Sequence, residues 1–211
     1  MKNREETERK LKEAVGELIK LKGFTGLKIS KIARLADVDR KLVYRYFGGL
    51  EGLIEAYILE NDYWMLFSDI LKEIIQESGP GKHQATIVAI LQNQFRFFYS
   101  GHVMQRLILF EISQPNDMMR SIHKAREAHG QVMFERLSTQ FVGSNVDIRA
   151  ITALLIGGIY YAILHARFNG GMISDIDIKT EAGQQSILNA LDQIIGWAFD
   201  EASKTSSKEP K

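Results

Sequence analysis

The sequence of 211 residues contains no cysteine and only three prolines, and its most apolar run, 150–164, is short. Without cysteine, disulfide bonds and thiolate chemistry are excluded. The apolar run falls below the roughly 20 residues of a membrane-spanning helix, and two glycines interrupt it, so we interpret it as a buried helix. The N-terminus is charged and no apolar run follows it, which is not typical of a secretion signal. We expect a cytoplasmic protein.

Composition predicts a soluble, all-α protein, because 45% of the residues are hydrophobic and few β-branched residues alternate with polar ones. The net charge of +1 argues against a general polyanion binder. The charge is nevertheless unevenly distributed. Residues 1–50 contain 13 Lys and Arg and 7 Asp and Glu, about +6, whereas the remaining 14 and 19 give about −5. A basic head on an acidic body suits a protein that presents one end to DNA.

Residues 28–47 have the pattern of two short helices joined by a tight turn. The positions that can pack inward are Ile29, Ile32, Ala33 and Ala36 in the first helix and Val38, Val43 and Phe47 after the turn. The positions that project outward from the second helix are Arg40, Lys41, Tyr44 and Arg45. A helix-turn-helix of this kind lays its second helix in a DNA major groove. A solvated charged face is the alternative interpretation.

Two acidic residues define the turn. Asp39 fits the N-cap of the second helix, because its carboxylate can accept a hydrogen bond from a backbone N–H in the first turn. Asp37 stands at the break, where it must either take or avoid a left-handed conformation, and Asp tolerates that conformation better than most residues.

The segment resembles the N-terminal domain of the TetR family of bacterial transcriptional regulators over about the first 55 residues. The residues in register with the family pattern are Gly23, Phe24, Ile32, Ala33, Ala36, Val38, Tyr44, Phe47 and Glu51. Two positions depart from the pattern: Asp37 replaces a common glycine, and Leu50 replaces a lysine that often contacts phosphate. Backbone N–H groups of Gly48 and Gly49 can serve the phosphate instead.

From these observations we predict the DNA contacts. The expected DNA-binding residues are Lys28, Ser30, Lys31, Arg34, Asp39, Arg40, Lys41, Leu42, Tyr44, Arg45, Gly48 and Gly49. Arg40, Lys41 and Arg45 are expected to contact bases or phosphates. Tyr44 is expected to donate to a phosphate and Leu42 to meet a thymine methyl group, while the first helix holds the DNA backbone.

The rest of the chain is predicted to be helical. Helices are expected at about 5–22, 50–77, 84–99, 103–113, 116–141, 147–168 and 180–202. We predict a DNA-binding domain over 1–49, a helical effector-binding and dimerisation domain over 50–202, and a disordered tail over 203–211. The last two helices combine small residues at three- and four-residue spacing with a broad apolar face. The family resemblance implies that they form a four-helix dimer interface. The alternative is that they belong to the core of one chain.

Aromatic and methionine side chains are frequent between residues 64 and 168, either as ordinary core or as the lining of a pocket for an apolar or aromatic small molecule. The TetR resemblance favours the pocket. The candidate ligand-binding residues are Trp64, Phe67, Phe98, Met104, Phe110, Met133, Phe134, Tyr161 and His165.

No pattern of catalytic residues is evident. His123 and Glu127 lie at i and i+4, a spacing that can share a metal, but a solvated pair is favoured. We therefore expect no metal site, no cofactor and no enzymatic activity. The sequence predicts a homodimeric repressor that releases its operator when a small molecule binds. A protein-binding adaptor and a helical enzyme without DNA binding remain the alternatives.

Overall fold

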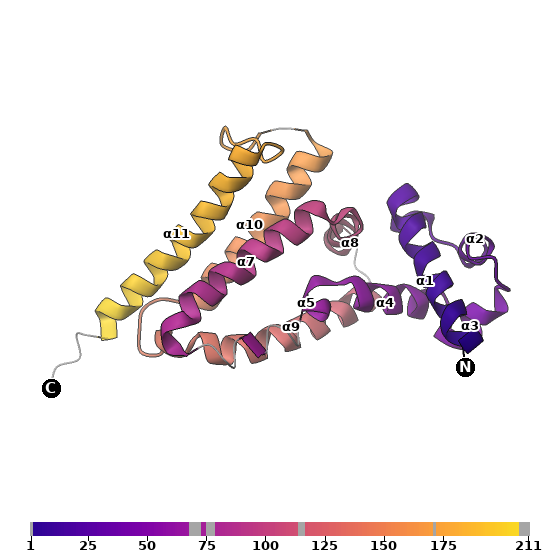
Figure 1. Ribbon diagram of the computed structural model, residues 1–211, viewed down its shortest axis with the longest axis horizontal. Coiled ribbons are helices and arrows are strands. Elements are labelled where there is room, and N and C mark those ends of the chain that lie inside the picture. Colours follow the sequence, from indigo (N-terminus) through magenta and orange to yellow (C-terminus); the bar gives the residue numbers. More distant parts are fainter. Residues whose placement is uncertain (1, 68–72, 75–78, 114–116, 171, 207–211) are drawn as a thin grey trace. The chain divides into compact units, whose positions relative to one another are not determined.

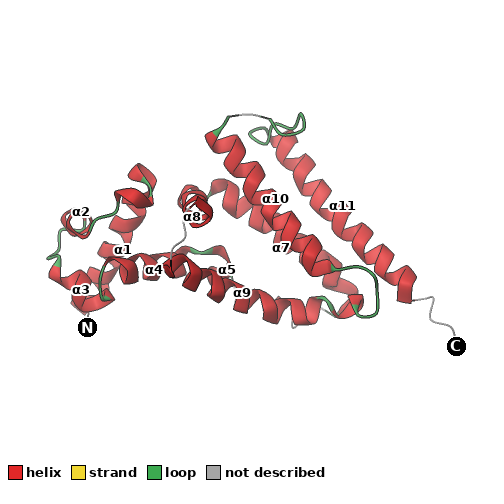
Figure 2. Ribbon diagram, turned by 180° about the vertical axis from the view of Figure 1, so that it is seen from behind, coloured by secondary structure: helices red, strands yellow, loops and turns green. Residues whose placement is uncertain are grey.

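The computed structural model describes residues 2–67, 73–74, 79–113, 117–170 and 172–206, and its regular elements in these ranges are helices (Figure 2). In chain order they are α1 (Lys2–Lys22), η1 (Phe24–Gly26), α2 (Ile29–Leu35), α3 (Lys41–Phe47), α4 (Leu50–Asn61), α5 (Tyr63–Leu66), η2 (Pro80–Lys82), α7 (His83–Ser100), α8 (His102–Ser113), α9 (Asp117–Leu137), η3 (Thr139–Phe141), α10 (Ile148–Phe168) and α11 (Glu181–Ser206) (Figure 1). The predicted all-α class is confirmed.

Packing divides the helices into two units. The N-terminal unit comprises residues 1–66 and 101–127, and the C-terminal unit comprises residues 67–100 and 128–211. In the N-terminal unit, α8 and the first half of α9 therefore join the segment that contains the helix-turn-helix. The predicted domain boundary after residue 49 was based on the end of the helix-turn-helix motif and not on how the helices pack. It stays a prediction.

The N-terminal unit has its core between α1, α2, α3 and α4. Its fully buried side chains are Leu11, Val15, Ile19, Ile32, Val43 and Leu53. Gly16 lets α1 approach α4 closely, because a Cβ atom there would lie 2.6 Å from the Tyr57 hydroxyl oxygen. Gly23 ends α1 with a positive φ of 70°, and its N–H bonds to the Ile19 carbonyl at 2.9 Å. This confirms Gly23 as the predicted C-cap.

The single long helix predicted over 50–77 is wrong, because α4 ends at Asn61 and α5 begins at Tyr63. Asp62 between them is extended, with φ −77° and ψ 135°. Its Oδ1 accepts the Trp64 backbone N–H at 3.0 Å, so the Asp62 carboxylate starts the new helix. Residues 68–72 and 75–78 of the predicted helix lie outside the described residues.

The C-terminal unit is built on α7, which packs against both α10 and α11. Its fully buried side chains include Leu91, Phe95, Phe98, Ile163 and Ile195. α11 continues to Ser206, so the disordered tail predicted from residue 203 is wrong for 203–206, and 207–211 lie outside the described residues. α10 begins as expected, since Asp147 Oδ1 accepts the Ala150 N–H at 3.0 Å.

α10 is longer than the apolar run in the sequence. By length and composition alone it could cross a membrane, although the core helices of soluble proteins pass the same test. Only a third of the most apolar stretch of α10 is buried, and Leu154 on this helix is 77% exposed. This helix therefore presents an apolar face that the C-terminal unit of one chain leaves open.

Candidate nucleic-acid interface

The turn between α2 and α3 is held by backbone hydrogen bonds. The Ala36 N–H bonds to the Ile32 carbonyl at 2.9 Å, and the Val38 N–H bonds to the Ala33 carbonyl at 3.0 Å. Asp37 has a φ of 53°, so of the two possibilities it takes the left-handed conformation. The change of direction at Asp37 separates the two helices and gives α3 its own axis.

Asp39 fixes the start of α3. Its Oδ1 accepts a hydrogen bond from the Lys41 backbone N–H at 2.8 Å. Arg40 already has right-handed helical angles, with φ −55° and ψ −26°, so Asp39 is the last non-helical residue before the recognition helix. The predicted capping role is therefore confirmed, although regular helix begins at Lys41.

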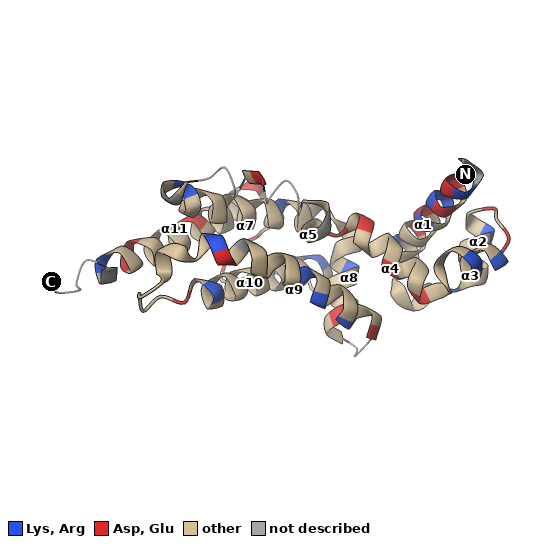
Figure 3. Cartoon of the chain, turned by 90° about the horizontal axis from the view of Figure 1, so that it is seen from below, with Lys and Arg blue, Asp and Glu red and all other residues tan. Residues whose placement is uncertain are grey.

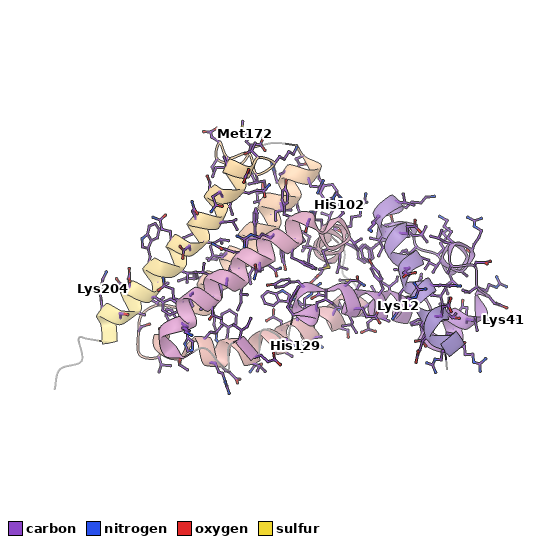
Figure 4. The ribbon with its side chains drawn as sticks, in the orientation of Figure 1. Lys12, Lys41, His102, His129, Met172 and Lys204 are labelled. Carbon is purple, nitrogen blue, oxygen red and sulfur yellow. The ribbon has the colours of Figure 1, made fainter. Side chains whose placement is uncertain are left out.

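The outward face of α3 is cationic and aromatic, as predicted. Arg40, Lys41 and Arg45 are exposed, and the Tyr44 side chain is 60% exposed. Lys41 projects from α3 away from the helical core of its unit (Figure 4). Val43, on the opposite face, is fully buried, so it anchors the helix while the cations face solvent.

The other predicted DNA-binding side chains lie at the start of α2 or on it, apart from Asp39 in the turn and Leu42 on α3. Lys28, Ser30 and Arg34 are exposed, whereas Lys31 and Leu42 are half-buried. Figure 3 shows the lysine and arginine positions along α1, α2 and α3. The exposed cations of the two helices can thus be offered to one polyanion.

Gly48 and Gly49 end the recognition helix. Gly48 has a φ of 75°, and its N–H donates to the Tyr44 carbonyl at 3.0 Å. The helix end thus uses the Gly48 N–H donor, and the predicted contact of Gly48 with a phosphate stays a prediction. Gly49 has a φ of 145°, and its predicted contact with a phosphate also stays a prediction.

One residue beside α3 was missed by sequence reasoning. Arg4, near the start of α1, lies over the Tyr46 ring, with its guanidinium carbon 5.1 Å from the ring centroid. Its Nε donates to Glu8 Oε1 at 2.7 Å. That hydrogen bond and the charge of Glu8 raise the pKa of Arg4 above its ordinary value. The Arg4–Glu8 spacing is visible in the sequence, but the contact with Tyr46 depends on the fold.

Three charged residues in the N-terminal unit form a buried cluster that the sequence did not predict. Arg126 on α9 donates from Nε to Asp62 Oδ2 at 2.8 Å and from Nη1 to Glu111 Oε2 at 2.6 Å. Asp62 is fully buried, and Arg126 is 9% exposed. Burial alone would lower the pKa of Arg126, but the two carboxylates raise it above its ordinary value. The cluster joins the end of α4 to α8 and α9.

His123 lies beside this cluster. Its Nδ1 is 3.6 Å from Glu111 Oε1, and its Nε2 is 4.0 Å from Glu127 Oε1. The His123 and Glu127 side chains are 57% and 74% exposed. Across the described ranges, no three His, Asp or Glu side chains gather as a group that could hold a metal ion. The arrangement is that of a solvated pair.

The candidate ligand-binding residues are distributed over both units. Trp64, Met104 and Phe110 belong to the N-terminal unit, and Phe67, Phe98, Met133, Phe134, Tyr161 and His165 to the C-terminal unit. The Met133 side chain lies outside the described part of the structure. Several of the rings pack on neighbours: Phe110 stacks on Phe24 with centroids 5.0 Å apart, and Phe98 lies 4.6 Å from Tyr160. Tyr161 is 63% exposed.

An open hollow of about 360 Å³ lies in the C-terminal unit. It is lined by Ser138, Phe141, Val142, Ser144, Asn145, Val146, Asp147, Ile148 and Arg149. None of the candidate ligand-binding residues contributes to it. Their role in effector binding therefore stays a prediction.

A capped, outward-facing cationic helix on a small helical core defines the N-terminal segment as a helix-turn-helix domain of the DNA-binding type. Residues 13–57 match the family model described as "Bacterial regulatory proteins, tetR family". The match covers this domain alone, so residues 13–57 carry the DNA-binding domain of the TetR family of bacterial transcriptional regulators. No curated protein sequence matches the chain.

Solved structures share the architecture over nearly the whole chain. FadR from Bacillus subtilis in complex with stearoyl-CoA is 19% identical, with a TM-score of 0.66, over 87% of this chain and 96% of that one. FadR from Bacillus halodurans is 17% identical, with a TM-score of 0.67, over 90% and 94%. A TetR family regulator from Marinobacter aquaeolei VT8 is 14% identical, with a TM-score of 0.65, over 92% and 97%. These similarities establish the fold.

Proposed function

We propose that this protein is a homodimeric, ligand-responsive transcriptional regulator that binds a palindromic operator through two copies of α3. The observation that carries the proposal is the exposed face of Arg40, Lys41, Tyr44 and Arg45 on a helix fixed by the Asp39 cap. In a two-fold dimer, the two half-sites lie about one helical turn, roughly 34 Å, apart, or a multiple of it.

The contacts divide into readout and positioning. Arg40, Lys41 and Arg45 reach base edges or phosphates, and an arginine can bind guanine O6 and N7 with two hydrogen bonds. Leu42 is half-buried, so the exposed part of its side chain meets a thymine methyl group. The Tyr44 hydroxyl donates to a phosphate, which fixes register without reading sequence.

The exposed face of α10 supports dimerisation. Leu154, Gly157, Gly158 and Tyr161 follow the i, i+3, i+4, i+7 spacing of one helix face, and Cβ atoms added at the two glycines would meet nothing within 4 Å. Trp197 on α11 is 61% exposed. A second copy of this face could approach closely at the glycines and bury the large apolar side chains on either side. Such self-complementary contacts are typical of two-fold dimers.

We place the effector in the helical body of the protein. Among the described residues, the buried polar atoms without a hydrogen-bond partner include Gln94 Oε1, His83 Nδ1 and His165 Nδ1, all in the C-terminal unit. A polar group of a bound molecule is one way to satisfy such atoms. Because Bacillus subtilis FadR has the same fold and binds stearoyl-CoA, a long-chain acyl thioester is the first effector to test.

DNA binding is tested by gel shift with DNA from upstream of the gene for this chain. The triple variant Arg40→Ala, Lys41→Ala, Arg45→Ala should lose operator binding. A control triple variant, Lys20→Ala, Lys22→Ala, Lys124→Ala, loses the same charge from exposed positions off α3 and should still bind. Undiminished binding by the α3 variant would end the assignment. A partner protein that co-purifies with a chain lacking DNA affinity would favour an adaptor.

Ligand control is tested separately. A ligand shifts the equilibrium between two conformations only if it prefers one of them. Stearoyl-CoA, or another apolar metabolite, should raise the thermal midpoint of the protein and weaken its operator binding. If neither quantity changes across such a set, ligand control loses its support while DNA binding stands.

A further inference from the structure

The start of α1 lies against the recognition helix through Arg4 and Tyr46. The guanidinium of Arg4 covers the Tyr46 ring at 5.1 Å, and its Nε is bonded to Glu8. The Arg4 side chain is 62% exposed. Tyr46 belongs to α3 itself, so the position of this cation is set relative to the face that carries Lys41 and Arg45.

Arg4 uses one of its hydrogen-bond donors within the protein and keeps its outer donors for another partner. An arginine side chain carries five N–H donors in a rigid fork, and only the Nε donor is used by Glu8. Within the described part of the chain, the Nη groups of Arg4 have no hydrogen-bond partner. An arginine with its ring face and its Nε held in place and its outer donors unused is prepared for an oxyanion that arrives from solvent.

The same helix provides a comparison. Arg9 and Glu13 form a second i, i+4 ion pair at 2.6 Å, and both side chains are 60% exposed. Arg4 and Arg9 therefore have the same charge, the same helix and nearly the same exposure. The aromatic contact with α3 belongs to Arg4, which places one of these two cations beside the recognition helix.

We propose that Arg4, held on the Tyr46 ring, is a further DNA-contacting residue that binds a backbone phosphate beside the groove occupied by α3. The inference rests on the proposed operator binding. Tyr46 is half-buried and follows Arg45 directly in α3, close to the Gly48–Gly49 end of that helix. Arg4 thus extends the cationic face sideways from the recognition helix to the flanking strand. The contact adds affinity and salt dependence but no direct sequence readout.

The competing explanation is that Arg4 only stabilises the packing of α1 on α3, and salt dependence separates the two. Each phosphate contact that a protein makes adds about 0.9 to the slope of log affinity against log salt. A dimer in which both copies lose Arg4 should therefore have a slope smaller by about 1.8. Between 50 and 200 mM salt, wild-type binding should weaken by about 12-fold more than binding of the variant.

The experiment measures operator affinity by fluorescence anisotropy over that salt range for Arg4→Gln and for the matched control Arg9→Gln. Arg4→Gln should lower the slope and Arg9→Gln should leave it at the wild-type value. Tyr46→Leu, which removes the ring, should behave as Arg4→Gln, and Tyr46→Phe, which keeps it, as wild type. Thermal midpoints recorded for each variant report folding independently.

Two results would overturn the inference. In the first, Arg4→Gln lowers the thermal midpoint, or it lowers the affinity by the same factor at every salt concentration, while the slope against salt stays unchanged. This result would show that Arg4 has a packing role. In the second, the two arginine variants change the slope equally, so only net charge matters. If the wild-type protein binds no operator, both the proposed function and this inference fail. If the wild type binds and Arg4→Gln leaves the salt slope unchanged, this inference alone is refuted.

Discussion

Replacing Arg126 with methionine tests how the N-terminal unit is held together. Methionine matches the length of the arginine stem but leaves the Asp62 carboxylate, which is fully buried, without its cation. Glu111, whose side chain is 18% exposed, loses the same partner. Removing one member of a buried ion pair costs about 3–5 kcal/mol, because the remaining charge stays desolvated. We expect Arg126→Met to lose stability of that size.

The expected shift in thermal midpoint follows from the size of the chain. For a protein of this length, 1 kcal/mol corresponds to roughly 2–4 °C, so the midpoint should fall by about 6–20 °C. The measurement is thermal unfolding at pH 7 and at fixed protein concentration, since the midpoint of the proposed dimer would depend on concentration. Because the pKa of Arg126 is raised above its ordinary value, its charge and its contribution are fully present at every pH below that ordinary value, which includes pH 7.

Lys124→Met is the matched control, because Lys124 is an exposed cation on the same helix. It should change the free energy of unfolding by less than about 0.5 kcal/mol. If Arg126→Met were as stable as Lys124→Met, the buried cluster would not hold α4 to α8 and α9, and the explanation of the break at Asp62 would be wrong.

Three other predictions concern packing, pH and assembly. Gly16→Ala should destabilise the protein by about 1–3 kcal/mol in chemical denaturation, because its methyl group would overlap the Tyr57 ring, whereas Gly130→Ala, with open space around it, should not. Burial raises the pKa of Tyr57 above its ordinary value of 10.0, so the free energy of unfolding should fall as the pH rises above 10.0. The fall should be smaller in Tyr57→Phe, and equal dependence of stability on pH in the two proteins would contradict this. Leu154→Asp should convert a dimer to a monomer in sedimentation, and an unchanged dimer would place the interface elsewhere.

The helix-turn-helix was predictable because its determinants are local. The inward spacing of Ile32 and Ala33, the left-handed Asp37 and the Asp39 cap all act within a few residues of one another. The same holds for the end of α1 at Gly23. Where a helix begins or ends through its own neighbours, the sequence is sufficient.

The break after α4 was not predictable in this way. Asn61 and Asp62 lie within an apolar helical pattern, and the partner that stabilises the buried carboxylate, Arg126, is 64 residues away. The contact of Arg4 with Tyr46 is equally remote in sequence. Aromatic side chains at helical spacing likewise do not reveal whether they pack on each other, as Phe24 and Phe110 do, or line a pocket.

The central claim is that the exposed face of α3 enters the major groove of an operator. Methylation by dimethyl sulfate tests it directly, because the reagent modifies guanine N7 in the major groove and adenine N3 in the minor groove. We predict protection of guanine N7 in two patches about one helical turn apart, or a multiple of it, and loss of both patches in the triple variant of Arg40, Lys41 and Arg45. Protection confined to adenine N3, or guanine protection that persists in the triple variant, would contradict the claim.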